Sequence, residues 1–319
     1  MKSKTKQSIV NKKSFESLLF SGAFDSFGHE RIQYLQPCQG EDSFVDSIVR
    51  YAELYKKDNE TSAFSLFGDI EEMKPARPVM PEYKGEVNEL EFLHREKELV
   101  GMYLSSHPLD KYGFEIDTFT NCPLDKLPEQ ILKCEEEKSP ANVRIGGYIT
   151  ASNTLVGKTG KPYSRTTIED FNGNYELSLF GKDHENFMSY LVPNTAIFIE
   201  GKIDEAYFVK GDEKETKKVP YKLKIKNIML LGNVTETYAS GLAILVSTTM
   251  LNDKFRESLV KCIKKNKGSI GLSMFLHDPT TGYKIEFASR KYKVSITNKF
   301  LDELKELGIN YRIITNLPK

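Results

Sequence analysis

The chain contains little from which a disulfide framework, a metal centre or a membrane span could be built. Its four cysteines show no CxxC pair and no regular spacing, which favours free thiols in a reducing compartment over a zinc site. No apolar run is long enough to cross a bilayer. The basic segment 1–13 is not followed by the apolar core of a signal peptide. We therefore expect a cytoplasmic protein that does not enter a membrane.

The signatures of common catalytic and nucleotide-binding sites are missing as well. None of GxxxxGK(S/T), GxGxxG, HExxH or GxSxG occurs. Glu169 and Asp170 are adjacent, but neighbouring residues of a strand point to opposite faces, so they are poorly placed to share a metal ion. His107 precedes Pro108 and has no second histidine close by, which favours a turn residue at a helix end over a catalytic base. The residues alone indicate a binding protein with no visible catalytic residue, metal or cofactor.

Length and composition predict several folded domains. The chain has 319 residues, of which 39% are hydrophobic and 28% charged, so it is long enough for two or three domains. The net charge is zero but unevenly distributed. Residues 41–100 carry 15 acidic and 8 basic side chains, whereas residues 241–319 carry 7 acidic and 14 basic ones. The acidic stretch is typical of a solvated surface, and the basic end is suited to nucleic acid or an acidic partner.

The segment 140–232 has the pattern of a small barrel of strands. From Val143 to Thr150 apolar and polar residues alternate, as in a half-buried strand. Asn172–Gly173 is a strong hairpin signal because both turn positions favour positive φ. We expect strands at 143–150, 163–171 and 175–180, a helix at 182–191, and strands at 196–203 and 221–231. This order is typical of an OB fold, a five-stranded barrel that binds oligonucleotides on its second and third strands.

Aromatic and basic side chains gather on the first strands and the first loop of this predicted barrel. Aromatic rings stack on bases and cations hold phosphates, so the mixture suits single-stranded nucleic acid. The candidate DNA-binding residues here are Arg144, Tyr148, Lys158, Lys161, Tyr163 and Arg165. The alternative is a polar face that meets only water or another domain. We favour contact with nucleic acid.

The first 60 residues predict helices joined by a glycine-bearing turn. Helices are expected after an Asn11 cap, at 29–35, at 42–57 and, further on, at 86–104. One interpretation is a helix-hairpin-helix module in which Gly22 and Gly28 bring backbone N–H groups close to a DNA phosphate. The other, which spacing alone favours, is an ordinary pair of helices with Phe24 and Phe27 in its core.

A short apolar peptide, SAFSLFG at 62–68, stands between a helix and an acidic, proline-containing stretch. Nothing nearby in the sequence would obviously bury Phe64, Leu66 and Phe67. An apolar peptide in such a polar setting is suited to docking in a groove of a partner protein. It could equally fold back onto its own domain, and the spacing does not decide between the two.

The C-terminal residues 241–319 predict a small α+β domain. Strands are expected at 242–247, 268–276, 283–288, 294–296 and 311–314, with helices at 252–265 and 298–307. The whole chain is then a multidomain α+β protein in four parts: residues 1–60, 61–139, 140–232 and 241–319.

Several motifs in this order resemble the C-terminal region of the bacterial DNA polymerase III alpha subunit. They are NKKSFESLLFSGAFDSFG, SLFG, EKELVGMYLSSHPLDKY and GKPYSRTTIEDFNGNYELSLF. The resemblance covers essentially the whole chain. GAFDSFG and GMYLSSHPLD are specific together, whereas the predicted barrel alone would not be. The family's order implies the end of a helix-hairpin-helix region, an internal sliding-clamp-binding peptide, an OB domain and a C-terminal domain that contacts the clamp-loader subunit tau.

The resemblance also implies particular residues. The clamp-binding peptide would be Phe64, Ser65, Leu66 and Phe67, with Ala63 where the family usually has glutamine. The family is a DNA-directed DNA polymerase whose palm carboxylates and Mg²⁺ are expected upstream of residue 1, so no cofactor is expected in this chain.

Three functional hypotheses follow. The leading one is a non-catalytic accessory portion of a replicative polymerase, as a fragment or one product of a split gene, which binds single-stranded template, sliding clamp and tau. The second is a stand-alone OB-fold protein that binds single-stranded nucleic acid without a role in replication. The third, an enzyme with polymerase activity of its own, is disfavoured by the lack of paired strand carboxylates.

Overall fold

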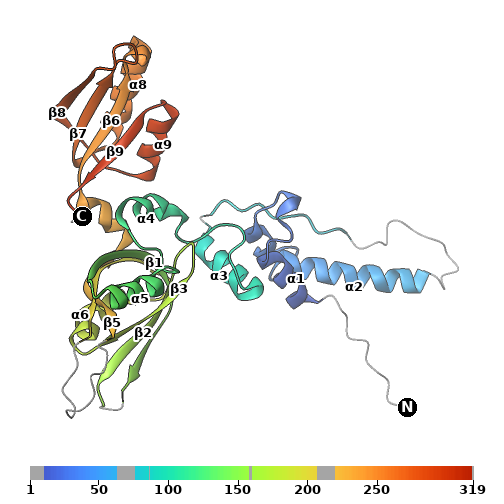
Figure 1. Ribbon diagram of the computed structural model, residues 1–319. Coiled ribbons are helices and arrows are strands. Elements are labelled where there is room, and N and C mark those ends of the chain that lie inside the picture. The colour runs from blue at the N-terminus through green and yellow to red at the C-terminus, as the bar shows by residue number, and fades with distance from the viewer. Residues whose placement is uncertain (1–10, 63–75, 86, 158–159, 207–219, 318–319) are drawn as a thin grey trace. The chain divides into compact units, whose positions relative to one another are not determined.

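The computed structural model describes residues 11–62, 76–85, 87–157, 160–206 and 220–317 (Figure 1). The chain divides into two compact units, residues 1–108 and 109–319. No helix in the described ranges combines the length and the hydrophobicity that a bilayer span requires.

The first unit is helical and encloses a small aromatic core. Its helices are α1 (Lys12–Phe20), α2 (Phe44–Ser62) and α3 (Glu89–Val100). The Asn11 side chain accepts a hydrogen bond from the backbone N–H of Ser14 at 2.9 Å, so the expected cap of α1 is present. The buried centre of the unit consists of Leu19, Tyr34, Phe44 and Val45.

The second helix expected at 29–35 is not an α-helix. Short 3₁₀ segments at Asp25–Phe27 and Arg31–Leu35 take its place. Hydrogen bonds from residue i+3 back to residue i close these segments tightly, as in the bond from the Phe27 N–H to the Phe24 carbonyl at 3.0 Å. Phe24 packs against the core, whereas Phe27 is 65% exposed. The helix-hairpin-helix prediction is therefore not confirmed.

The ends of the longer helices also differ from expectation. Helix α3 stops at Val100 because Gly101 adopts φ +89° and donates its N–H to the Lys97 carbonyl at 2.8 Å. A glycine in the left-handed region is a common way to end a helix. Helix α2 continues past the expected end at residue 57 and reaches Ser62.

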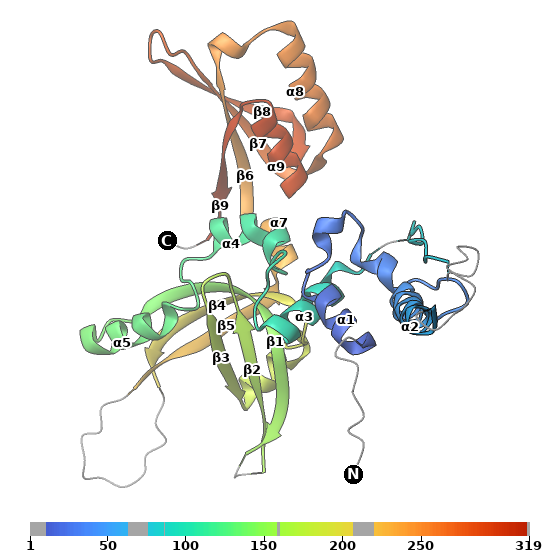
Figure 2. The same cartoon turned by 90° about the vertical axis from the view of Figure 1, so that its right-hand side faces the viewer.

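The second unit contains the expected five-stranded antiparallel sheet. The strands are β1 (Ala141–Val156), β2 (Pro162–Glu169), β3 (Asn174–Phe180), β4 (Ala196–Glu205) and β5 (Tyr221–Leu230). Their order is β3-β2-β1-β4-β5, with every ladder antiparallel (Figure 2). Helix α6 (Lys182–Phe187) joins β3 to β4. The number of strands, their sequence order and the position of the helix agree with the OB-fold prediction.

Two helices occupy the segment expected to be a plain connector, residues 111–139. They are α4 (Gly113–Phe119) and α5 (Leu127–Glu137). Just before α5, the Leu124 N–H donates to the Asp170 carboxylate at 2.7 Å. Asp170 also accepts from the N–H groups of Asn172 and Gly173 at 2.8 and 2.9 Å. The β2–β3 turn and the entry to α5 are thus held by one buried carboxylate.

Residues 239–315 form a second, four-stranded sheet. Its strands are β6 (Ala239–Ser247), β7 (Lys267–His277), β8 (Lys284–Val294) and β9 (Asn310–Thr315), in the order β8-β7-β6-β9. Helix α8 (Asp253–Lys265) links the parallel pair β6 and β7, and α9 (Asn298–Glu306) precedes β9. The two helices meet where Lys265 pairs with Glu303 (Figure 2). Of the short strand expected at 294–296, only Val294 lies in a strand, as the last residue of β8.

The buried residues of the second unit form two clusters. One fills the inside of the five-stranded sheet, with Ile145, Ile168 and Ile199 among its members. The other includes Phe198 of β4 together with Leu242 and Phe300 of the C-terminal sheet and helix. One apolar cluster therefore includes residues from both sheets. This cluster also contains Val234 of α7 (Val234–Tyr238), the short helix between them.

Candidate nucleic-acid interface

An exposed aromatic pair lies on the outer side of β2 and β3. Tyr163 is directly opposite Phe180 in the β2–β3 ladder and opposite Leu155 in the β1–β2 ladder. The two rings are stacked, with centroids 4.8 Å apart and planes 16° apart. Phe180 is 61% and Leu155 37% exposed. We call these three residues the aromatic row; it leaves a flat apolar surface open to a ligand.

A polar row lies next to the aromatic row. Arg165 is opposite Asn153 of β1 and Ser178 of β3. Its Nε lies 3.1 Å from the Glu176 Oε1, and both side chains are about half exposed. The outer face of these strands thus offers a stacking surface beside a guanidinium whose orientation is set by a carboxylate. That combination suits a single strand whose bases stack and whose phosphates meet the cation.

The structure places some of the predicted DNA-binding residues together on the outer face of the sheet, whereas others do not face a ligand. Tyr163 and Arg165 are neighbours on the outer face, and Lys161 is exposed at the start of β2. Lys158 lies outside the described residues. Tyr148 is only 3% exposed and belongs to a core cluster. The expectation that Tyr148 faces a ligand is therefore wrong, because α4 and its surroundings cover the outer side of β1 at that point.

Arg144 has a structural partner. Its Nε donates to the Phe119 carbonyl at 3.1 Å, at the end of α4. Its backbone N–H donates to Asn121 at 2.7 Å. These two bonds fasten the segment after α4 to β1, so the geometry gives Arg144 a role in the fold.

The backbone N–H groups of the two glycines proposed for phosphate contact also form hydrogen bonds within the chain. The Gly22 N–H donates to the Leu19 carbonyl at 3.1 Å, and the Gly28 N–H to the Asp25 carbonyl at 3.2 Å. Both residues have positive φ, +81° and +75°. A Cβ at Gly22 would lie 2.5 Å from the Arg31 Nη2. Gly22 is thus needed for close approach of this arginine, and neither N–H is directed at a ligand.

Arg31 links the two most specific motifs of the chain. It contacts Asp25 of GAFDSFG at 2.5 Å, and Glu96 of α3 at 2.8 Å. It also donates to the Ser105 hydroxyl of GMYLSSHPLD at 2.7 Å. Glu96 is fully buried. Burial raises the pKa of Glu96, but hydrogen bonds from Ser105, Arg31 and the Leu104 N–H outweigh it and lower the pKa to about 2. The carboxylate stays ionised and holds the motifs together.

The residues of the proposed clamp-binding peptide, Phe64, Ser65, Leu66 and Phe67, lie outside the described residues.

An apolar groove of about 380 Å³ lies on the C-terminal sheet between α8, β7 and β8. Phe255, Leu259 and Ile263 of α8 line one side, and Met274 and Phe287 line the other. Phe287 is 47% exposed. The expected C-terminal domain therefore carries an open apolar surface beside basic side chains.

Sequence reasoning missed Phe180 and Glu176. Counting from a two-residue turn at Asn172–Gly173 would set Phe180 opposite Arg165, but it would set Glu176 opposite Glu169, away from Arg165. The observed ladder pairs Glu169 with Asn174, and the Asp170 carboxylate accepts a bond from each of the two turn N–H groups. Neither turn residue has positive φ, so the expected tight hairpin turn is wrong. In the described ranges, no three His, Cys, Asp or Glu side chains gather as a metal site would require.

The fold and this surface define an α+β protein with an open aromatic and basic face on a five-stranded antiparallel sheet. Residues 242–314 match the family model described as the DNA polymerase III alpha subunit, C-terminal domain. The resemblance to the C-terminal region of bacterial DNA polymerase III alpha subunits is thereby confirmed, and full-length relatives extend it over most of the chain.

Among these relatives is the DNA polymerase III subunit alpha of Vibrio cholerae, 23% identical over 303 residues that cover 93% of this chain and 24% of that protein. The subunit from Haemophilus influenzae is 24% identical with the same coverage. That from Saccharopolyspora erythraea is 30% identical over 63% of this chain and 16% of its own length. The chain thus spans about a quarter of the length of the first two of these curated relatives.

A solved mitochondrial single-stranded DNA-binding protein of S. cerevisiae covers 28% of the chain at 18% identity and a TM-score of 0.21.

Proposed function

We propose that this chain is the DNA-contacting, C-terminal accessory portion of a cytoplasmic replicative polymerase of the alpha-subunit type. The observation that carries the proposal is the aromatic row with Arg165 beside it, on a chain related to polymerase III alpha subunits. In this proposal a single-stranded template lies across β2 and β3. Base stacking on an aromatic side chain contributes about 1–3 kcal/mol per base, and Arg165 and Lys161 attract the backbone.

The chain provides attachment and no chemistry in this proposal. The polymerase carboxylates and their Mg²⁺ belong to another part of the alpha subunit. A second contact with DNA near the primer end raises the effective concentration of the polymerase there. Two further contacts complete the proposal. Leu66 and Phe67 dock on a sliding clamp, and the basic C-terminal domain, through its apolar groove, contacts the clamp-loader subunit tau.

The nucleic-acid contact is tested by fluorescence anisotropy with a labelled oligo(dT) 15-mer. Tyr163→Ala is expected to weaken binding by about 5- to 150-fold, which corresponds to about 1–3 kcal/mol. Tyr163→Phe keeps the ring and should bind nearly as well as the unmodified chain. Tyr283→Ala is a matched control, since Tyr283 is a 75% exposed aromatic residue elsewhere in the unit. Equal affinities of Tyr163→Ala and Tyr283→Ala would remove the aromatic row from the function.

The clamp contact is tested separately by calorimetry with a bacterial sliding clamp. The double variant Leu66→Ala/Phe67→Ala is expected to lose binding while its circular dichroism stays unchanged, because both apolar anchors are gone. Thr61→Ala, just before the peptide, serves as the control. Undiminished clamp affinity in the double variant would refute this part of the proposal.

A further inference from the structure

Four lysines stand on the outer side of β4 and β5, away from the aromatic row. Alternate residues of these strands, among them Ile199, Ile203 and Leu223, pack into the core cluster inside the sheet. Residues between them point to the other side. We call the outward set Lys202, Lys222, Lys224 and Lys226 the lysine strip.

The strand register confirms that the strip shares one side of the sheet. Lys202 of β4 is directly opposite Lys224 of β5, and Asp204 is opposite Lys222. Lys226 is the extra residue of a bulge, and its Nζ donates to Asn142 of β1 at 3.0 Å. Asn142 is in turn opposite Lys202. The strip therefore runs along β5 with one member on β4.

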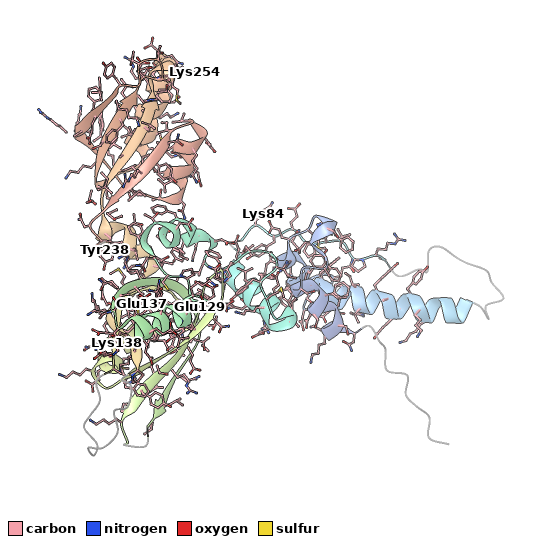
Figure 3. All side chains as sticks on the ribbon, in the orientation of Figure 1. Lys84, Glu129, Glu137, Lys138, Tyr238 and Lys254 are labelled. Atoms are coloured by element: carbon pink, nitrogen blue, oxygen red, sulfur yellow. The ribbon has the colours of Figure 1, made fainter. Side chains whose placement is uncertain are left out.

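The strip has one carboxylate among its ion pairs in the described part of the chain. Asp204 lies 2.9 Å from the Lys202 Nζ and 4.0 Å from the Lys224 Nζ. Two of the four lysines thus share this aspartate. Glu200, further along β4 on the same side, accepts a hydrogen bond from the hydroxyl of Tyr238, which is labelled in Figure 3, at 3.0 Å and is opposite Arg144.

Stability of the sheet explains only part of this arrangement. Like charges directly opposite each other in neighbouring strands are destabilising; Lys202 faces Lys224 in this way, and Asp204, paired with both, offsets part of the repulsion. Lysines on an edge strand protect it from pairing with other chains, which accounts for those on β5. It does not account for Lys202, because β4 is bonded on both sides, to β1 and to β5.

The strip and the aromatic row lie on the same side of the sheet at opposite ends of β1. The outward residue Tyr148 is opposite Glu169 of β2, which shares the side of Tyr163 and Arg165. Near its other end β1 contains Asn142, which lies next to the lysine strip. Between the two regions the outer side of β1 is covered, since Ile116 and Thr120 approach the Cβ position of Gly146 to 3.3 and 3.2 Å. The two surfaces are therefore separate.

We propose that the lysine strip is a second contact for the phosphate backbone of a nucleic-acid strand, separate from the aromatic row. The identity of the ligand rests on the proposed function. The strip contains no aromatic or aliphatic member, so it holds phosphates and does not stack bases. Lysine is a compact point charge on a flexible stem and suits a phosphate. Alternate residues of a strand are about 6.6 Å apart, which is the spacing expected for Lys222 and Lys224, and Lys226 follows at the bulge. The cores of protein–protein interfaces are depleted in lysine, which favours a polyanion over a protein partner.

The experiment compares the double variant Lys222→Gln/Lys224→Gln with Lys254→Gln/Lys261→Gln. The control removes the same charge from exposed positions of α8 in the same unit (Figure 3 labels Lys254). Binding of oligo(dT) 30-mer and 6-mer is measured by anisotropy between 50 and 300 mM salt. Each phosphate contact with a single strand contributes about 0.7 to the slope of log K against log salt. For the 30-mer we expect the magnitude of that slope to be smaller by about 1.4 in the strip variant and unchanged in the control.

The other outcomes separate this proposal from the proposed function. Equal changes of slope in both double variants would show an effect of net charge alone and overturn the site. An unchanged slope in the strip variant would also overturn it, and the proposed function would still stand if Tyr163→Ala weakens binding. The 6-mer, which is held by stacking on the aromatic row, should be unaffected by the strip variant. An equal loss for 6-mer and 30-mer would refute the claim that the two contacts are separate.

Discussion

Replacement of Glu96 by glutamine is expected to destabilise the first unit by about 3 kcal/mol. The side chain is fully buried and lies 2.8 Å from the Arg31 guanidinium, with the Ser105 N–H donating to it at 2.8 Å. The balance of burial and these hydrogen bonds lowers the pKa of Glu96 from 4.5 to about 2. One pKa unit corresponds to about 1.4 kcal/mol, so the ionised carboxylate contributes about 3 kcal/mol at neutral pH. Removing one partner of a buried ion pair typically costs a similar amount, about 3–5 kcal/mol.

The pH dependence of this contribution has a definite sign. The pKa of Glu96 is lower in the folded state than in the unfolded chain, so the stabilisation is complete above about pH 4.5. It is lost as the pH falls toward about 2, because the unfolded chain takes up a proton that the folded unit resists. The Glu96→Gln variant should lack this acid-sensitive part of its stability.

Hydrogen–deuterium exchange followed by mass spectrometry can measure the effect in one unit at a time. At pH 7 the exchange protection of amides in α1 and α3 should fall by about 100-fold in Glu96→Gln, as about 3 kcal/mol implies. Amides of α8 in the other unit should not change. At pH 3.5 the difference in exchange protection between Glu96→Gln and the unmodified chain should be smaller than at pH 7.

The matched control is Glu98→Gln, on the same helix with a side chain that is 72% exposed. Exposed ion pairs contribute about 0–1 kcal/mol, so this variant should resemble the unmodified chain. Equal protection in Glu96→Gln and Glu98→Gln would refute the reasoning.

Three further predictions concern the second unit. A Cβ at Gly147 would lie 2.3 Å from the Ile168 Cγ2, so Gly147→Ala should lower the free energy of unfolding by about 1–3 kcal/mol, measured by thermal unfolding. Gly113→Ala is the control, because a Cβ at Gly113 would meet no atom within 4 Å. Equal melting temperatures of the two variants would contradict the packing. Asp170→Ala leaves the N–H groups of Leu124, Asn172 and Gly173 without their acceptor, so urea unfolding should show a loss of about 1–3 kcal/mol, whereas exposed Asp183→Ala should show none. Burial and a hydrogen bond with Glu303 raise the pKa of Cys262 from 9.0 to about 11, so its alkylation by iodoacetamide at pH 8 should be about 100-fold slower than that of a thiol with the ordinary pKa. Labelling of Cys262 ahead of the more accessible Cys38 would contradict this.

Local sequence patterns predicted most of the secondary structure of the second unit. Alternation over 143–150 placed β1, because a strand with one buried face must alternate. The Asn172–Gly173 turn does separate β2 from β3, but neither residue has positive φ and the loop is longer than the expected two-residue hairpin, since Glu169 pairs with Asn174. The amphipathic segment 252–265 became α8 almost residue for residue. The motifs GAFDSFG and GMYLSSHPLD led to the resemblance to DNA polymerase III alpha subunits because they are specific strings of residues that need no structure to be recognised.

The candidate interface was predicted only in part. Tyr163 and Arg165 were found because their strand alternates regularly. Tyr148 was misplaced because alternation tells which residues share a side, and does not tell whether a neighbouring element covers that side. The outer side of β1 is open near Leu155 and covered near Tyr148, and the covering comes from α4 and the C-terminal sheet.

The sequence by itself determined the local features of this protein, namely its periodicity, its turns, its helix cap at Asn11 and its family motifs, since these depend on residues a few positions apart. Only the tertiary structure decided which charges meet. The contact between Arg31 and Glu96 joins residues 65 positions apart. The lysine strip exists because the register of β4 and β5 sets Lys202 opposite Lys224. Pairings over such separations depend on how whole elements pack, and no pattern within a short stretch of sequence specifies them.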